Sequence, residues 1–265
     1  MFTIIDLVQP HTLEEAYNFL ISRRNNAVLG GCAFLKINSK KIGTAIELSK
    51  LNLNYIKEVG DYIEIGASAT FRDIEINSLV KDSFNGVLTS AVENIIGIQF
   101  RNVVNIGATV FSKYGFSDVI TALLALDTEV ELYKGGRMPL NEFLKRPSEK
   151  DILTRIFIKK NDRVALYKSF RNSSTDLPIL NITVSKLDND WRIVVGARPV
   201  TARIAVKASN LLSKQELNGS LIEDVAQMVT EELTFGSNMR GSAEYRRAIC
   251  KVIVKRTIME VAACR

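Results

Sequence analysis

Two short turns that carry glycine are the parts of this sequence best suited to hold a phosphate group. The first is Leu29-Gly30-Gly31-Cys32-Ala33-Phe34, and the second is Asn105-Ile106-Gly107-Ala108-Thr109. Glycine permits positive φ and lets backbone N–H groups approach an anion, because no Cβ stands in the way. Neither turn matches GxGxxG or GxxxxGK[ST], and a glycine pair after a strand is more often only a turn. Taken singly, each turn could therefore bind phosphate or be only a turn between two elements.

Residue types for acid–base or metal chemistry are scarce. His11 is the only histidine, which excludes a Ser-His-Asp triad and a multi-histidine metal site. We interpret it as a solvated residue ahead of a helix. The three cysteines, Cys32, Cys250 and Cys264, are far apart and form no CxxC pair. This spacing argues against a disulfide framework and against a four-thiolate iron–sulfur or zinc site, so we expect no metal in this chain.

The elements around the first turn are predicted from local signals. Thr12-Leu13-Glu14-Glu15 has capping-box spacing ahead of apolar positions, which predicts a helix over about 12–23. The apolar runs Ala27–Leu29 and Ala45–Leu48 predict strands, so the amino end should be βαβ-like. The glycine pair then lies where the first of these strands ends.

A second α/β unit is expected to carry the second turn. Tyr55–Val59 and Tyr62–Ile65, joined by Gly60-Asp61, predict a hairpin. Further helices are expected from Thr70, over 87–96 and over 120–126, followed by a strand over 129–133. The second turn lies between the last two of these helices.

From Ile152 the sequence favours strands, over 152–158, 164–170, 179–185 and 191–195, and then three helices, over 201–212, 221–233 and 242–262. Strands followed by helices indicate an α+β domain with an antiparallel sheet. The boundary is expected near Arg163, which divides the chain into residues 1–162, with parts of about 1–54 and 55–162, and residues 163–265. We interpret Ser242–Arg247 as a structural helix start whose charges hold the two domains together.

Composition narrows the class of protein. The 265 residues are 46% hydrophobic and 24% charged, as in ordinary globular proteins. The formal charge of +6 comes from scattered basic pairs interleaved with acidic residues, so solvated faces are favoured over a nucleic-acid surface. No apolar run approaches the roughly 20 residues that span a bilayer, so we expect a cytoplasmic protein without a membrane anchor.

Several segments, in order along the chain, resemble the FAD-binding subunits of the molybdenum hydroxylases, the family of xanthine dehydrogenase and of the carbon monoxide dehydrogenase medium subunit. The resemblance covers nearly the whole chain. In the amino-terminal part it rests on Ala27–Gly31, Ile65–Ala67, Gln99–Gly107 and Gly115–Asp118, and in the carboxyl-terminal part on Thr175–Pro178, Gly196–Pro199 and Ser242–Arg247.

This resemblance implies a fold and a function. The fold would be α+β, with a two-part FAD-binding domain of the p-cresol methylhydroxylase and vanillyl-alcohol oxidase type, followed by a smaller α+β domain of the carbon monoxide dehydrogenase flavoprotein type. The chain would bind FAD non-covalently and contribute no catalytic side chain. Electrons would arrive from [2Fe–2S] clusters and molybdopterin in an iron–sulfur subunit and a molybdenum-cofactor subunit, and would leave to NAD or another soluble acceptor.

The resemblance also implies a set of cofactor contacts, mostly from the two glycine-rich turns, which hold the FAD pyrophosphate in this family through their backbone. The further contacts are a side chain beside the flavin, Leu153, and three polar residues. Together they are Ala27, Val28, Leu29, Gly30, Gly31, Cys32, Ala33, Phe34, Asn105, Ile106, Gly107, Ala108, Thr109, Ser112, Asp118, Leu153 and Lys168. Alternatively, Asp118 caps a helix, Leu153 packs in the core and Lys168 is a solvated strand residue.

The chain departs from the family at both turns. The common second turn is Thr-Ile-Gly-Gly-Asn, where this chain has Ala108 and Thr109, and Cys32-Ala33 replaces a polar pair in the first. Fewer side-chain hydrogen bonds and one added Cβ should weaken FAD binding. A subgroup with a Tyr/Phe-Gly-Phe-Ser-Asp signature, which Tyr114–Asp118 resembles, tolerates such changes. Two rival functions stay open: a self-sufficient flavin oxidoreductase, and a non-enzymatic module that has lost FAD.

Overall fold

Three sheets organise the computed structural model, which describes residues 2–35, 39–198 and 200–264. The first sheet is parallel, with the order β1-β3-β2, and α1 packs on it. Its elements are β1 (Thr3–Val8), α1 (Leu13–Ser22), β2 (Ala27–Leu29) and β3 (Lys41–Glu47). Thr12 caps α1 by accepting a hydrogen bond from the Glu15 N–H at 3.1 Å, which confirms the helix predicted from the capping-box spacing.

The second sheet is antiparallel, with the order β4-β5-β8-β6-β7. Its strands are β4 (Ile56–Val59), β5 (Tyr62–Gly66), β6 (Thr128–Leu132), β7 (Gly136–Pro139) and β8 (Leu153–Lys159). The predicted hairpin is confirmed, and Gly60 supplies the positive φ of +56° that its turn requires. A strand predicted over 129–133 is also present as β6.

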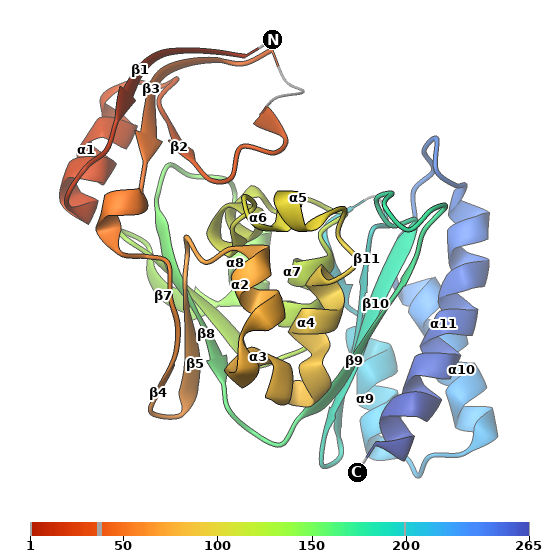
Figure 1. Ribbon diagram of the computed structural model, residues 1–265. Coiled ribbons are helices and arrows are strands. Elements are labelled where there is room, and N and C mark those ends of the chain that lie inside the picture. Colours follow the sequence, from red (N-terminus) through yellow and green to blue (C-terminus); the bar gives the residue numbers. More distant parts are fainter. Residues whose placement is uncertain (1, 36–38, 199, 265) are drawn as a thin grey trace.

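Short helices fill the middle of the molecule, between the second sheet and the third (Figure 1). They are α2 (Phe71–Ile76), α3 (Ser78–Asp82), α4 (Val87–Val92), α5 (Ile98–Arg101), α6 (Ile106–Ser112), α7 (Asp118–Leu124) and α8 (Leu140–Lys145), with 3-10 turns η2 (Ser49–Leu51) and η3 (Phe84–Gly86). Every residue of α7 is buried, because α7 packs on α4 and α6 and against β10 and β11 of the third sheet.

The third sheet is antiparallel, with the order β12-β11-β10-β9, and the last three helices cover its other face (Figure 1). Its elements are β9 (Val164–Phe170), β10 (Leu180–Leu187), β11 (Asp190–Gly196), β12 (Arg203–Ile204), α9 (Val206–Lys214), α10 (Gly219–Glu232) and α11 (Ala243–Ala263). The α+β class predicted from the sequence is confirmed. Among the described residues, no helix combines the length and the apolar character needed to cross a bilayer.

Two of the predicted helices differ from the observed ones. The helix expected over 87–96 ends at Val92, and the chain then turns so that the backbone N–H of Ile95 bonds to the Val92 carbonyl oxygen. The helix expected over 201–212 begins only at Val206, because Arg203 and Ile204 add the edge strand β12 to the third sheet. In both places tertiary contacts override a helical pattern.

Candidate cofactor site

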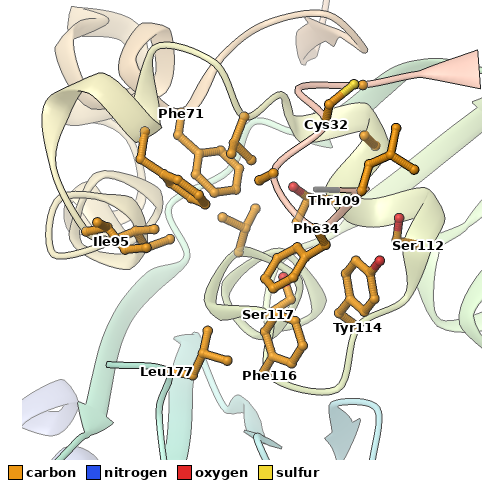
Figure 2. A pocket seen from close by; sticks show the side chains of 18 of the residues that line it. Cys32, Phe34, Phe71, Ile95, Thr109, Ser112, Tyr114, Phe116, Ser117 and Leu177 are labelled. Atoms are coloured by element: carbon orange, nitrogen blue, oxygen red, sulfur yellow. The ribbon is translucent and has the colours of Figure 1, made fainter. Parts of the chain in front are cut away.

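A cavity of about 290 Å³ lies where three parts of the chain meet: the end of β2, the central helices, and the connection between β9 and β10 (Figure 2). Eleven of the predicted contact residues line it: Ala27, Val28, Leu29, Gly30, Cys32, Ala33, Phe34, Ala108, Thr109, Ser112 and Asp118. The fold therefore gathers residues from Ala27 to Asp118, far apart in the sequence, around one cavity.

The two glycine turns are packed directly against each other. A Cβ on Gly30 would overlap the Cβ of Ala108. Gly31 has φ +65°, and a Cβ there would lie 2.5 Å from the carbonyl oxygen of Val103. Glycine is required at both positions because the first turn approaches the backbone that leads into the second. Gly31 lies in the chain between two residues that line the cavity, Gly30 and Cys32.

The backbone donors of the second turn are already in use. The N–H groups of Ile106 and Gly107 donate to the carbonyl oxygens of Ala69 and Ala67, each at 2.9 Å. Those of Ala108 and Thr109 donate to the side-chain and backbone oxygens of Asn105, at 2.9 and 3.3 Å. The turn thus starts helix α6 and fixes it on the end of β5. Asn105, Ile106 and Gly107 do not line the cavity.

Gly107 is required by packing and not by its backbone angles. Its φ is not positive, in contrast to that of Gly31. A Cβ on Gly107 would lie 2.5 Å from the Cβ of Ala67 and 2.6 Å from the Ala67 carbonyl oxygen. A branched side chain here would push α6 away from β5, so its effect on the cavity would come through displacement of the helix.

The first turn keeps backbone donors available for an anion. The N–H groups of Gly31 and Ala33 donate to no acceptor within the described part of the chain. Lys40, Thr109 and Ser112 also line the cavity. Free N–H groups in a turn with left-handed residues form a concave anion site, and Cys32 follows Gly31 in this conformation with φ +53°. These residues fit a pyrophosphate.

Aromatic side chains form a further wall of the cavity. The rings of Phe34, Tyr114 and Phe116 lie at centroid separations of 5.1 Å from one another, and the Tyr114 and Phe116 rings are stacked. Figure 2 shows Phe34, Tyr114 and Phe116 grouped on one side of the cavity, with Phe71 and Ile95 on another. Such surfaces accept flat aromatic groups, because offset stacking and apolar burial act together.

Asp118 joins the cavity wall to the third sheet. Its carboxylate is 5% exposed and accepts hydrogen bonds from Asn181 Nδ2 at 3.1 Å and from the Tyr167 hydroxyl, and it pairs with Arg171 Nη2 at 2.9 Å. Burial raises the pKa of Asp118, and the Arg171 charge opposes that shift. Burial and the Asp118 charge raise the pKa of Tyr167 well above its usual value, so Tyr167 stays a donor.

The alternative role of Asp118 as a helix cap is wrong. Helix α7 is capped by the preceding residue, because the side chain of Ser117 accepts the hydrogen bond from the Ile120 N–H at 3.2 Å. Asp118 is the first residue of the helix and points its carboxylate to β9 and β10.

Leu153 and Lys168 lie outside the cavity lining. Leu153 is 5% exposed and packs in the large core between the second sheet and the central helices. Lys168 Nζ pairs with Glu260 Oε2 of α11 at 2.6 Å, and both side chains are exposed. Their locations match the alternatives of a core residue and a solvated strand residue.

Lining residues that the sequence did not reveal are mostly apolar, such as Phe71, Ile95 and Phe100, and nothing in the local pattern separates them from core positions. Arg171 was also missed. It lies three residues after Lys168, just beyond the end of β9, and its position beside the Thr175–Pro178 segment was the one available signal.

The cysteines provide a direct probe of the cavity. Cys32 lines it, Cys264 is partly exposed near the end of α11, and Cys250 is buried with its pKa raised to about 12 by burial. Because the thiolate is the reactive form, iodoacetamide at pH 8 should modify Cys32 and Cys264 and leave Cys250 intact. Added FAD should slow modification of Cys32 several-fold with no effect on Cys264, as followed by mass spectrometry. Equal rates at Cys32 with and without FAD would contradict this location of the cofactor.

Two family models match the chain. The model described as the FAD binding domain in molybdopterin dehydrogenase matches residues 2–160, and that of the CO dehydrogenase flavoprotein C-terminal domain matches residues 165–261. Both matches agree with the predicted α+β fold, an FAD-binding part followed by a part of the carbon monoxide dehydrogenase flavoprotein type.

Individual relatives match over nearly their whole lengths. The chain is 28% identical to the glyceraldehyde dehydrogenase medium chain of Sulfolobus acidocaldarius, covering 96% of this chain and 97% of that one. It is 25% identical to the nicotine 6-hydroxylase medium subunit of Paenarthrobacter nicotinovorans, covering 98% of each. A structure of carbon monoxide dehydrogenase from Hydrogenophaga pseudoflava matches with a TM-score of 0.90 at 20% identity, covering 98% of both chains, and supports the fold.

Proposed function

Since the chain belongs to the FAD-binding subunits of the molybdenum hydroxylases, we propose that it receives electrons from the iron–sulfur clusters of a partner subunit on a bound FAD and delivers them to NAD or another soluble acceptor. A molybdenum-cofactor subunit would carry the substrate pocket. The names of the relatives, a medium chain and a medium subunit, support membership of a multi-subunit enzyme. A cytoplasmic location is part of the proposal.

The observation that carries the proposal is the packing of the two glycine turns at one cavity. Gly30 meets Ala108 without room for a Cβ, and the N–H groups of Gly31 and Ala33 stay available beside them. This arrangement combines anion donors with an aromatic wall, which is the combination that a dinucleotide needs.

Particular residues would hold the parts of FAD. The N–H groups of Gly31 and Ala33, with Thr109 and Ser112, would hold the pyrophosphate. Phe34, Tyr114 and Phe116 would support a flat ring. Asn105, Ile106 and Gly107 would act by fixing α6, since their donors are used within the chain. Contacts from Leu153 and Lys168 have no support from their positions.

The redox chemistry belongs to the flavin when it is bound, and the chain contributes binding, orientation and exclusion of water. The apolar lining residues Phe71, Ile95 and Phe100 would exclude water from the bound cofactor. The buried Asp118–Tyr167–Asn181 hydrogen bonds join α7 to β9 and β10 and so keep the two domains in one arrangement around the cofactor. An acid–base pair is not required for this role.

Reconstitution of the complex from its subunits tests which subunit carries the metal centres and which carries the FAD. Among the described residues no group of three or more potential ligands could hold a metal, so the FAD-loaded chain alone should contain no stoichiometric iron or molybdenum and should not hydroxylate substrate. Mixing with the iron–sulfur and molybdenum subunits should restore substrate-dependent acceptor reduction, through an interface of roughly 1,200 Å² or more.

The acceptor is identified in the same preparation. The FAD-loaded chain, reduced anaerobically with dithionite, is mixed with NAD, a quinone or oxygen, and the acceptor that reoxidises it fastest is assigned. Bleaching of the flavin by an organic substrate in the isolated chain would contradict the proposal and identify a self-sufficient flavin oxidoreductase.

A further inference from the structure

Among the described residues, one cation lies on the wall of the cavity formed by the third sheet, and it is Arg171. The other basic residue of the described lining, Lys40, comes from the amino-terminal part of the chain. Lys168, the lysine implied by the family resemblance, is engaged with Glu260 on the exposed surface. Arg171 would therefore supply any positive charge beside the cofactor on this wall.

Arg171 is held rigidly in place. Its Nη2 pairs with Asp118 Oδ1 at 2.9 Å, its Nη1 donates to the Asp176 carbonyl oxygen at 2.7 Å, and its Nε donates to Ser169 Oγ at 3.2 Å. The side chain is 10% exposed. A guanidinium fixed on three sides keeps a defined direction, and its remaining N–H groups are available to the cavity that it lines.

The wall around Arg171 fits the polar edge of a flavin ring. Four polar residues of the lining lie beside Arg171: Asp118 and Asp176, which accept its hydrogen bonds, and their chain neighbours Ser117 and Thr175. The isoalloxazine ring has a row of hydrogen-bonding atoms along one edge, whereas the pyrophosphate is accounted for by the glycine turns. Charges and hydrogen bonds near N1 and N5 are the means by which proteins tune a flavin.

We propose that Arg171, rather than Lys168, is the cation that faces the flavin ring and raises its reduction potential, and that Asp118 is a positioning residue whose charge partly offsets it. This inference rests on the proposed function. Two electrons and one proton from the solvent convert the oxidised ring to an anion whose charge lies on the N1–C2=O edge. A guanidinium beside that edge stabilises the reduced form more than the oxidised form.

The Arg171–Asp118 pair predicts shifts of opposite sign. Removing the guanidinium takes away the donor to the ring and leaves a carboxylate on the wall, which disfavours the reduced anion. Removing the carboxylate charge leaves the positive charge of the guanidinium less neutralised, which favours the reduced anion. Tyr167 and Asn181 can still donate to an amide oxygen at position 118, so this second change keeps those links to the third sheet.

The test compares the midpoint potentials of the FAD-loaded full chain and its variants by anaerobic spectroelectrochemistry. Arg171→Gln should lower the equilibrium constant for reduction about tenfold, which is about 30 mV for a two-electron couple. Asp118→Asn should raise the potential, and Lys168→Gln should leave it unchanged. A merely structural role for Arg171 would alter thermal stability without these opposed shifts.

Three results would overturn the inference: a shift in Lys168→Gln without one in Arg171→Gln, shifts of the same sign in Arg171→Gln and Asp118→Asn, or no shift in either. If Arg171→Gln retains no FAD, Asp118→Asn decides, since a higher potential supports the inference and an unchanged or lower one contradicts it. Failure of the unaltered chain to bind FAD would instead defeat the proposed function.

Discussion

Replacing Gly31 by alanine is expected to weaken FAD binding about tenfold, equivalent to about 1.4 kcal/mol, while the chain stays folded. The new Cβ would lie 2.5 Å from the carbonyl oxygen of Val103 and 2.8 Å from the Cα of Val104. Because these are backbone atoms, the turn itself must shift away from the segment that leads into α6. That shift moves the N–H groups of Gly31 and Ala33, which we propose to hold the pyrophosphate.

Gly60→Ala is the matched control. Gly60 also has a positive φ, +56°, but a Cβ there meets no atom within 4 Å among the described residues. Both variants carry the cost of a left-handed alanine, about 1 kcal/mol, and only Gly31→Ala carries the backbone clash. Fluorescence titration with FAD and thermal melts of both variants separate these effects. Normal FAD affinity in Gly31→Ala, or an equal loss in Gly60→Ala, would show that the first turn does not bind the cofactor.

The largest loss of stability is expected from Arg246→Leu. Arg246 is 1% exposed, and among the described residues it pairs with no carboxylate. Its Nε donates to the Ile179 carbonyl oxygen at 3.0 Å, its Nη1 to those of Gly236, at 2.7 Å, and Gly241, and its Nη2 to Asn238 Oδ1 at 2.6 Å. The variant leaves these buried acceptors without a donor, so we expect the free energy of unfolding to fall by about 3 to 5 kcal/mol.

The neighbouring residue gives a control of the same chemistry. Arg247 is exposed on α11, with a ring contact to Phe235 at 6.0 Å, so Arg247→Leu should change stability by less than about 1 kcal/mol. Thermal melts should show a fall of about 10 °C for Arg246→Leu, at about 2 to 4 °C per kcal/mol. Similar melting temperatures for the two variants would contradict a structural role of the buried guanidinium.

The effect of Arg246 should extend to the cavity. The loop that it holds carries Arg240, which pairs with Asp176 at 3.2 Å, and Asp176 lines the cavity. The expectation that Ser242–Arg247 holds the two domains together is wrong for Arg246, since its partners are Ile179, just before β10, and residues of the loop between α10 and α11. Sequence position gave no information on where this side chain would turn.

The sequence predicted elements well where the signal was local. The capping residue Thr12 and the turn glycine Gly60 specify α1 and the β4–β5 hairpin through interactions between near neighbours. Prediction failed where distant contacts decide. Ile204 belongs to a strand because it pairs with the free edge of β11. Asp118 accepts hydrogen bonds from β9 and β10, and Ser117 caps the helix in its place.

The residues of the candidate site likewise fall into those that the sequence predicts and those that it does not. Glycine turns are visible in a sequence because few other residues tolerate a positive φ or so close an approach, and Gly30 and Gly31 meet that condition. Phe71 and Ile95 were not predicted, because an apolar residue that lines a cofactor cavity has the same local pattern as a core residue. Lys168 and Arg171 are both cations near the end of β9, and only the position of α11 shows that the former turns away.

The flavin content of the purified chain shows whether this cavity holds FAD. The chain is saturated with FAD, freed of excess cofactor, precipitated with acid, and the flavin in supernatant and pellet is identified and measured. We expect stoichiometric FAD, all of it in the supernatant, because Gly31, Ala33 and the aromatic wall would hold it without a covalent bond. A colourless chain that takes up no FAD would contradict the account and identify a module that has lost its cofactor.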